Sequence, residues 1–149
     1  CSYFKREKIM IYVSNSESQT ISFASKFSKK VKLGSVIALI GNLGSGKTTF
    51  TKGFAKGLNI KAHVGSPTFK IVSEYEGQYF NLYHIDSYRL KNSNDFLKIG
   101  GEEFLIQETG FTLIEWADLI KDILPKKTIT INFSRLDHEN SRRIEVQDY

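Results

Sequence analysis

The chain of 149 residues is poor in several residue types that would indicate particular classes of protein. Cys1 is the only cysteine, which excludes an internal disulfide and a cysteine-ligated metal cluster. The longest apolar runs have only the length of a strand, and the first residues lack the apolar stretch of a secretory signal. We therefore expect a cytoplasmic protein without a membrane span.

Length and composition predict a single domain over residues 1–149. Hydrophobic residues make up 40% of the chain and aromatic residues 13%, which is enough for one core. Residues 1–9 precede the only methionine, Met10, and are either a native extension or a vector remnant. The sequence contains no internal repeat, linker or low-complexity segment.

A glycine-rich segment at residues 41–48 completes the phosphate-loop pattern G-x-x-x-x-G-K-[ST]. The glycines allow backbone N–H groups to wrap around phosphate oxygens, Lys47 adds a positive charge, and the Thr48 hydroxyl is a ligand for Mg²⁺. The alternative is a surface glycine turn beside an ordinary lysine. The residues expected to contact a nucleotide are Gly41, Asn42, Leu43, Gly44, Ser45, Gly46, Lys47, Thr48 and Thr49.

The sequence around this loop predicts an α/β fold. Residues 36–40 are continuously apolar, as in a parallel strand covered on both faces, and Phe50, Phe54, Ala55 and Leu58 recur at helical spacing. We expect a P-loop NTPase fold with a mostly parallel central sheet, an antiparallel hairpin and flanking helices. The expected strands are 9–13, 36–40, 69–75, 79–86, 111–116, 128–133 and 143–146. One expected helix follows the capping box at 16–19 and another follows the loop. Two further helical stretches are expected over about 95–107, with an interruption at Gly100 and Gly101, and over 117–124.

The net charge is +5 and the isoelectric point is near 9.2. Lys26, Lys29, Lys30 and Lys32 cluster near the end of the first predicted helix, where cations suit the helix dipole. This pattern favours a solvated surface. The alternative is an electrostatic contact with a partner, or with RNA that the partner holds.

Several residues outside the loop are candidates for an active site. Glu115 ends an apolar strand, the position where nucleotide hydrolases place the acid that holds Mg²⁺ or its water. The alternative is that Glu115 is an ordinary surface residue. His84 and Asp86 are two apart on one predicted strand and point to the same face. Asp86 is either a carboxylate that orders water or metal, or a turn cap, and His84 is most simply a structural imidazole. Thr68 is either a switch residue that senses the γ-phosphate or a turn residue.

Four sequence blocks occur together in a fixed order: GNLGSGKTTF at 41–50, SPTF at 66–69, HIDSYRL at 84–90 and IEWAD at 114–118. In these blocks the chain resembles the TsaE (YjeE) family, over about residues 11–146. A phosphate loop alone is shared by a whole superfamily, whereas the four blocks together are specific to this family.

The resemblance implies an ATP-hydrolysing subunit of tRNA threonylcarbamoyladenosine synthesis. Its partners are then the TsaD and TsaB proteins, with tRNA reached only through their complex. By analogy Lys47 contacts the β and γ phosphates and is catalytic together with Asp86 and Glu115, and Thr48, Glu115 and Asp86 serve Mg²⁺. By the same analogy Thr68 senses the presence of the γ-phosphate. The residues expected near the adenine are Ser14, Thr20 and Arg135.

Other functions use the same loop. A small-molecule kinase usually needs an arginine-rich lid, and this chain has only Arg6, Arg89, Arg135, Arg142 and Arg143. A GTPase would carry an N-K-x-D or T-K-x-D guanine motif, which the sequence lacks. A nucleotide-sensing module without productive catalysis is the remaining alternative.

Overall fold

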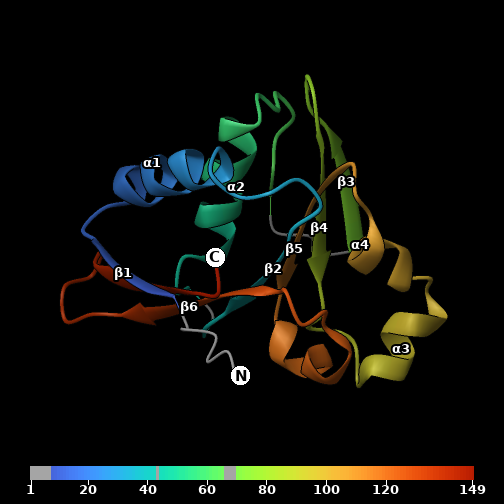
Figure 1. The fold of residues 1–149 in the computed structure, drawn as a ribbon. Helices are drawn as coiled ribbons and strands as arrows, with labels where there is room; N and C mark the ends of the chain where they lie inside the picture. The colour runs from blue at the N-terminus through green and yellow to red at the C-terminus, as the bar shows by residue number, and fades with distance from the viewer. Residues whose placement is uncertain (1–7, 43, 66–69) are drawn as a thin grey trace, which may run out of the picture.

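The computed structural model describes residues 8–42, 44–65 and 70–149 as a sheet with helices on both faces (Figure 1). The strands are β1 (Ile9–Ser14), β2 (Val36–Ile40), β3 (Val72–Glu76), β4 (Asn81–Asp86), β5 (Gly110–Glu115), β6 (Ile129–Arg135) and β7 (Arg142–Gln147). The helices are α1 (Glu17–Ser28), α2 (Lys47–Gly57), α3 (Ser93–Lys98), α4 (Glu102–Ile106) and the 3₁₀ helix η1 (Ala117–Ile123).

The seven strands form one sheet in the order β1-β7-β6-β2-β5-β4-β3. The four central strands β6, β2, β5 and β4 run parallel, and antiparallel neighbours extend the sheet at both edges. The predicted mostly parallel centre and the predicted hairpin, β3–β4, are therefore confirmed. Because the central strands are parallel, the carboxyl ends of β2, β4 and β5 meet at one edge of the sheet.

Both faces of the central sheet are buried, as the apolar run of β2 predicts. Ile37 and Leu39 face the core beneath α1 and α2, whereas Val36 and Ala38 face a second core beneath α3, α4 and η1. Side chains of a strand alternate between its faces, so a strand covered by helices on both sides must be apolar throughout.

Helices α1 and α2 pack closely, side by side on one face of the sheet (Figure 1). Two glycines of α2 allow this approach. A Cβ at Gly53 would lie 2.5 Å from the Ile21 carbonyl oxygen, and one at Gly57 would lie 2.5 Å from the Ser25 carbonyl oxygen. In the first turn of α1 the predicted N-cap is present, since Ser16 Oγ accepts from Gln19 N at 3.0 Å; the return bond of the predicted capping box is shifted by one residue, with Gln19 Oε1 accepting from Asn15 N at 2.7 Å.

Some predicted boundaries are wrong. The helix expected over 117–124 is a 3₁₀ helix, kinked at Ile120, and the strand expected over 111–116 ends at Glu115 because Trp116 is left-handed, with φ of 57°. The helical stretch expected over 95–107 consists of α3 and α4, which the left-handed Gly100 separates as its glycine pair indicates. Strand β3 begins at Val72, and Phe69 lies outside the described residues.

In the described part of the chain, no helix combines the length and apolar character that crossing a membrane requires.

Candidate functional site

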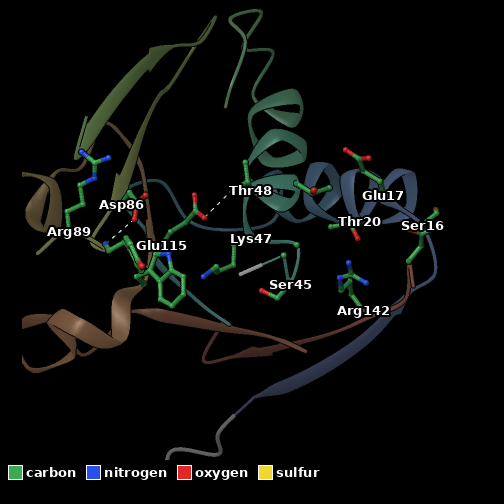
Figure 2. A pocket seen from close by; sticks show the side chains of 16 residues that line it. Ser16, Glu17, Thr20, Ser45, Lys47, Thr48, Asp86, Arg89, Glu115 and Arg142 are labelled. Atoms are coloured by element: carbon green, nitrogen blue, oxygen red, sulfur yellow. Dashed lines mark hydrogen bonds between the residues drawn. The ribbon is translucent and has the colours of Figure 1, made fainter. Parts of the chain in front are cut away.

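A cavity of about 570 Å³ opens at the edge of the sheet where β2, β4 and β5 end. Figure 2 shows Asp86 and Glu115 on one side of it, Glu17, Thr20 and Arg142 on the other, and Lys47 between them. Its walls come from the phosphate loop, the start of α1 and the ends of β4, β5 and the β6–β7 hairpin. The residues that line it are Ser16, Glu17, Thr20, Gly44, Ser45, Gly46, Lys47, Thr48, Thr49, Asp86, Tyr88, Arg89, Glu115, Trp116, Asn140 and Arg142.

The phosphate loop joins β2 to α2 as its sequence predicts. Gly44 and Gly46 have φ of 76° and 108°, a left-handed backbone that side chains disfavour. Gly46 is the N-cap of α2 and provides no side-chain hydrogen bond, so the first N–H groups of this helix remain available to an anion. Of the nine loop residues expected at a nucleotide, 44–49 line the cavity, Gly41 and Asn42 do not, and Leu43 lies outside the described residues.

Lys47 places a buried positive charge in the cavity, with only 5% of the residue exposed. Its Nζ donates to the Gly41 carbonyl oxygen at 2.6 Å and lies 3.5 Å from the centre of the Trp116 ring. Burial lowers the pKa of Lys47 from its ordinary value, and the nearby carboxylates, Glu115 first, oppose this shift. The side chain is thus held at the loop by a carbonyl and an aromatic face, both of which favour a cation.

Glu115 connects three elements at the end of β5. Its Oε1 accepts from Thr48 Oγ1 at 3.2 Å, and its Oε2 lies 2.5 Å from His84 Nε2 (the contact with Thr48 is dashed in Figure 2). Glu115 is 5% exposed and His84 is fully buried. An ionised carboxylate only accepts hydrogen bonds, so His84 Nε2 carries the proton and donates it. His84 is therefore bonded to a residue that lines the cavity.

Asp86 pairs with Glu115 in the register of β4 and β5, and both side chains line the cavity. Its Oδ1 accepts from Tyr88 N at 3.0 Å, so the carboxylate also caps the turn after β4. Burial raises the pKa of Asp86 above its ordinary value, and the nearby Glu115 charge adds to this effect, while the Tyr88 hydrogen bond opposes it. The interpretation of Asp86 as a turn cap is therefore confirmed, and the same side chain also lines the cavity.

The other end of the cavity differs from the sequence prediction. Thr20 lines it as expected, but Ser14 is fully buried and bonds to Thr20 Oγ1 at 2.7 Å and to the Ser16 carbonyl at 2.8 Å. Ser14 is thus a support for α1 rather than part of the wall. Arg135 is exposed and does not line the cavity, whereas Arg142, its partner in the β6–β7 register, does.

For some lining residues the sequence indicates no role in the site beyond their presence in one of the four sequence blocks. Trp116 lies over Lys47 and packs on Tyr88 with ring centres 5.1 Å apart. Arg89 also belongs to the wall. Thr68, the expected switch residue, lies outside the described residues.

The oxygen atoms of the site suit a divalent cation that also binds phosphate. Thr48 Oγ1 and Glu115 Oε1 are 3.2 Å apart, close enough for one cation to contact both. No cluster of three or more His, Cys, Asp or Glu residues that could enclose a metal occurs in the described residues. Mg²⁺ needs no such enclosure, because it binds through one or two protein oxygens, phosphate and water.

Comparisons with known proteins agree on one family. Residues 14–144 match the family described as "Threonylcarbamoyl adenosine biosynthesis protein TsaE". The tRNA threonylcarbamoyladenosine biosynthesis protein TsaE of Treponema pallidum is 39% identical over 134 residues, 90% of this chain and 97% of the relative. The protein of the same name from Bacillus subtilis is 46% identical over 104 residues, 70% of this chain and 64% of that protein. The crystal structure of Bacillus subtilis YdiB is similar with a TM-score of 0.81 at 35% identity, and the match covers 95% of this chain and 86% of that chain.

The raised pKa of Asp86 predicts a gain in stability on removing its charge. In metal-free buffer at neutral pH, Asp86→Asn should raise the free energy of unfolding, because the folded state disfavours the ionised carboxylate. The asparagine Oδ1 can keep the hydrogen bond from Tyr88 N. The gain should vanish as the pH falls through the folded pKa toward 3.8, where the carboxylate is protonated in both states.

Urea unfolding at a series of pH values measures this effect. Asp137→Asn is the matched control, since Asp137 is exposed in the β6–β7 connection and away from the cavity wall. An equal gain in both variants, or no gain for Asp86→Asn, would contradict the prediction.

Proposed function

The chain belongs to the TsaE family, and from this we propose that it is a Mg²⁺-dependent ATPase that supports the formation of threonylcarbamoyladenosine in tRNA. The observation that carries the proposal is the cavity itself, which joins the free N–H groups of α2 and the Lys47 ammonium to the Thr48–Glu115 oxygen pair. These are the groups that a nucleoside triphosphate with its cation requires.

The phosphates are bound by the loop and the helix that follows it. Residues 44–48 line the cavity at the start of α2, where the first helical N–H groups have no side-chain cap, and the positive end of the α2 dipole adds to their field. Lys47 is already held among these groups, so its charge is fixed before the phosphate arrives. Fixed donors lose little entropy on binding, which favours tight binding of the β and γ phosphates.

Thr48, Glu115 and Asp86 are the residues proposed to hold Mg²⁺. When bound, the cation neutralises charge that develops on the phosphate oxygens during hydrolysis. Without a hydrogen-bond partner, the Glu115 carboxylate could adopt several orientations. The hydrogen bond from His84 occupies one carboxylate oxygen and leaves the other beside Thr48. We therefore include His84 as a residue that positions Glu115.

Hydrolysis needs a water molecule aligned with the γ-phosphate. Asp86 is half-buried in the cavity, and its Oδ1 is bonded to Tyr88 N, which leaves Oδ2 as the oxygen to accept a hydrogen bond from that water. The water attacks the γ-phosphorus, the bond to the β-phosphate oxygen breaks, and ADP and phosphate leave. The positive charge of Lys47 offsets the negative charge of the phosphate oxygens throughout this step.

The proposed partners are the TsaB and TsaD proteins, which the resemblance implies, and the proposed location is the cytoplasm. Arg89 and Arg142 line the cavity, but Arg142 Nη1 already donates to the carbonyls of Glu139 and Ser141. We propose that turnover is slow in the isolated chain and increases in the complex, because a partner can supply charge to the transition state.

Lys47→Ala should remove most of the affinity for ATP with Mg²⁺. The variant lacks the fixed cation of a buried polyphosphate site. Isothermal titration calorimetry on the folded variant measures the loss. Lys52→Ala is the control, since Lys52 is on the same helix but does not line the cavity. Unchanged affinity in Lys47→Ala would show that the nucleotide binds elsewhere.

Asp86→Asn should keep the affinity for nucleotide within a few fold yet slow hydrolysis by about a hundredfold. Release of γ-phosphate is measured with and without TsaB and TsaD, in the presence of sugars and nucleosides as possible acceptors. Phosphate found on an acceptor would indicate a kinase instead. Equal rates for Asp86→Asn and the parent chain in the complete assay would exclude the role of Asp86.

His84→Leu should raise the Mg²⁺ concentration needed for half-maximal binding of an ATP analogue by about 10- to 100-fold, because Glu115 loses the donor that orients it. His84→Gln should recover part of the effect, since its amide can donate. Affinity without Mg²⁺ should be similar in all three proteins. A role limited to folding would lower stability without changing the Mg²⁺ dependence of the folded variants.

A further inference from the structure

The excess of positive over negative charge in the chain lies in one segment. Residues 18–73 contain the lysines 26, 29, 30, 32, 47, 52, 56, 61 and 70 and no Asp or Glu, so all 16 acidic residues lie outside the segment. Soluble surfaces usually carry both signs interspersed. A segment of this length with one sign of charge therefore needs an explanation beyond solubility.

The fold brings these lysines together. The C-terminal ends of α1 and α2 touch, because a Cβ on Gly57 would meet Ser25 and Ser28. Exposed lysines lie at and just beyond this contact (Figure 1 shows the two helices together). We call this surface the lysine face; it consists of Lys26, Lys29, Lys30, Lys32, Lys56 and Lys61.

No ion pair of the described residues involves a lysine of the lysine face. The ion pairs found in the described residues are His84–Glu115 and Arg143–Glu145. The helix dipole favours Lys26, at the end of α1, and Lys56, at the end of α2. It does not account for Lys32 and Lys61, which follow the helices.

The chemistry of the lysine face fits a phosphate backbone better than a protein or a membrane. Protein interfaces are enriched in aromatic residues and arginine and depleted in lysine. Membrane-binding surfaces insert aromatic or aliphatic side chains beside their basic residues. Leu33 is the only large apolar side chain within residues 18–65 that is exposed in the described chain. Lysine is a point charge that contacts phosphate without reading sequence.

We propose that the lysine face binds the sugar–phosphate backbone of RNA. The choice of RNA among polyanions rests on the proposed function in tRNA modification. The contact would be electrostatic and independent of base sequence.

The lysine face and the nucleotide cavity are separate, so both can be occupied. The first residues of α1 and α2 line the cavity, whereas the lysine face lies at the C-terminal ends of the same helices. Helices of 12 and 11 residues span about 16 to 18 Å. RNA on the lysine face would therefore leave the phosphate loop open.

The experiment measures binding of a fluorescent, unmodified tRNA transcript to the full chain by anisotropy over a series of salt concentrations. The test variant is Lys29→Gln/Lys30→Gln/Lys56→Gln. The control variant, Lys98→Gln/Lys121→Gln/Lys126→Gln, removes the same charge from exposed sites on the opposite face of the sheet. The slope of log K against log salt should fall in magnitude by about 2 to 3 in the test variant, and by less than about 1 in the control.

Several results would overturn the proposal. These are equal slopes in the two variants, no binding of tRNA by the parent chain, or binding to phosphatidylserine vesicles without binding to tRNA. Calorimetry with ATP and Mg²⁺ on the same proteins keeps the two proposals apart. Absence of nucleotide binding by the parent chain would contradict the proposed ATPase function. Equal salt slopes in the test and control variants would contradict RNA binding by the lysine face.

Discussion

The Glu115 carboxylate is the group on which the geometry of the site depends. It ends β5, lies beside Leu39 of β2 and Asp86 of β4 in the register, and bonds to Thr48 of α2 and His84 of β4. A carboxylate that is 5% exposed is costly without hydrogen-bond donors. Thr48 and His84 satisfy it. The bond from Thr48 also ties the first turn of α2 to the sheet, so the same contact stabilises the fold and brings the proposed cation ligands together.

Burial acts against both charges that the proposed chemistry uses. It lowers the pKa of Lys47 and raises that of Asp86, and in each case it disfavours the ionised form. The two charges partly compensate each other across the cavity, together with Glu115. A site of this kind trades some stability for charges in a position to bind phosphate and cation. The lysine face is the opposite case, since its charges are exposed and lie at the far ends of the same helices.

Features that depend on neighbouring residues could be predicted from the sequence. The phosphate loop is continuous, and its glycines, its lysine and the helix after it follow from backbone geometry alone. The capping box at Ser16 and Gln19 is likewise local. The apolar run of β2 indicates burial on both faces, and burial of this kind occurs almost only in a parallel α/β sheet. The four blocks identify the family, and the comparisons confirm it.

The sequence by itself thus determined the loop, the parallel core and the family, because each is written in contiguous residues or their period. Only the tertiary structure decided which distant side chains meet. His84 and Glu115 are 31 residues apart, and strand register brings them together. Ser14 supports α1 instead of lining the cavity, and Arg142 lines it rather than its register partner Arg135, which neighbouring residues in the chain do not determine. The lysines of α1 and α2 form one surface for the same reason, since packing of the helices, and not spacing in the chain, sets their distance.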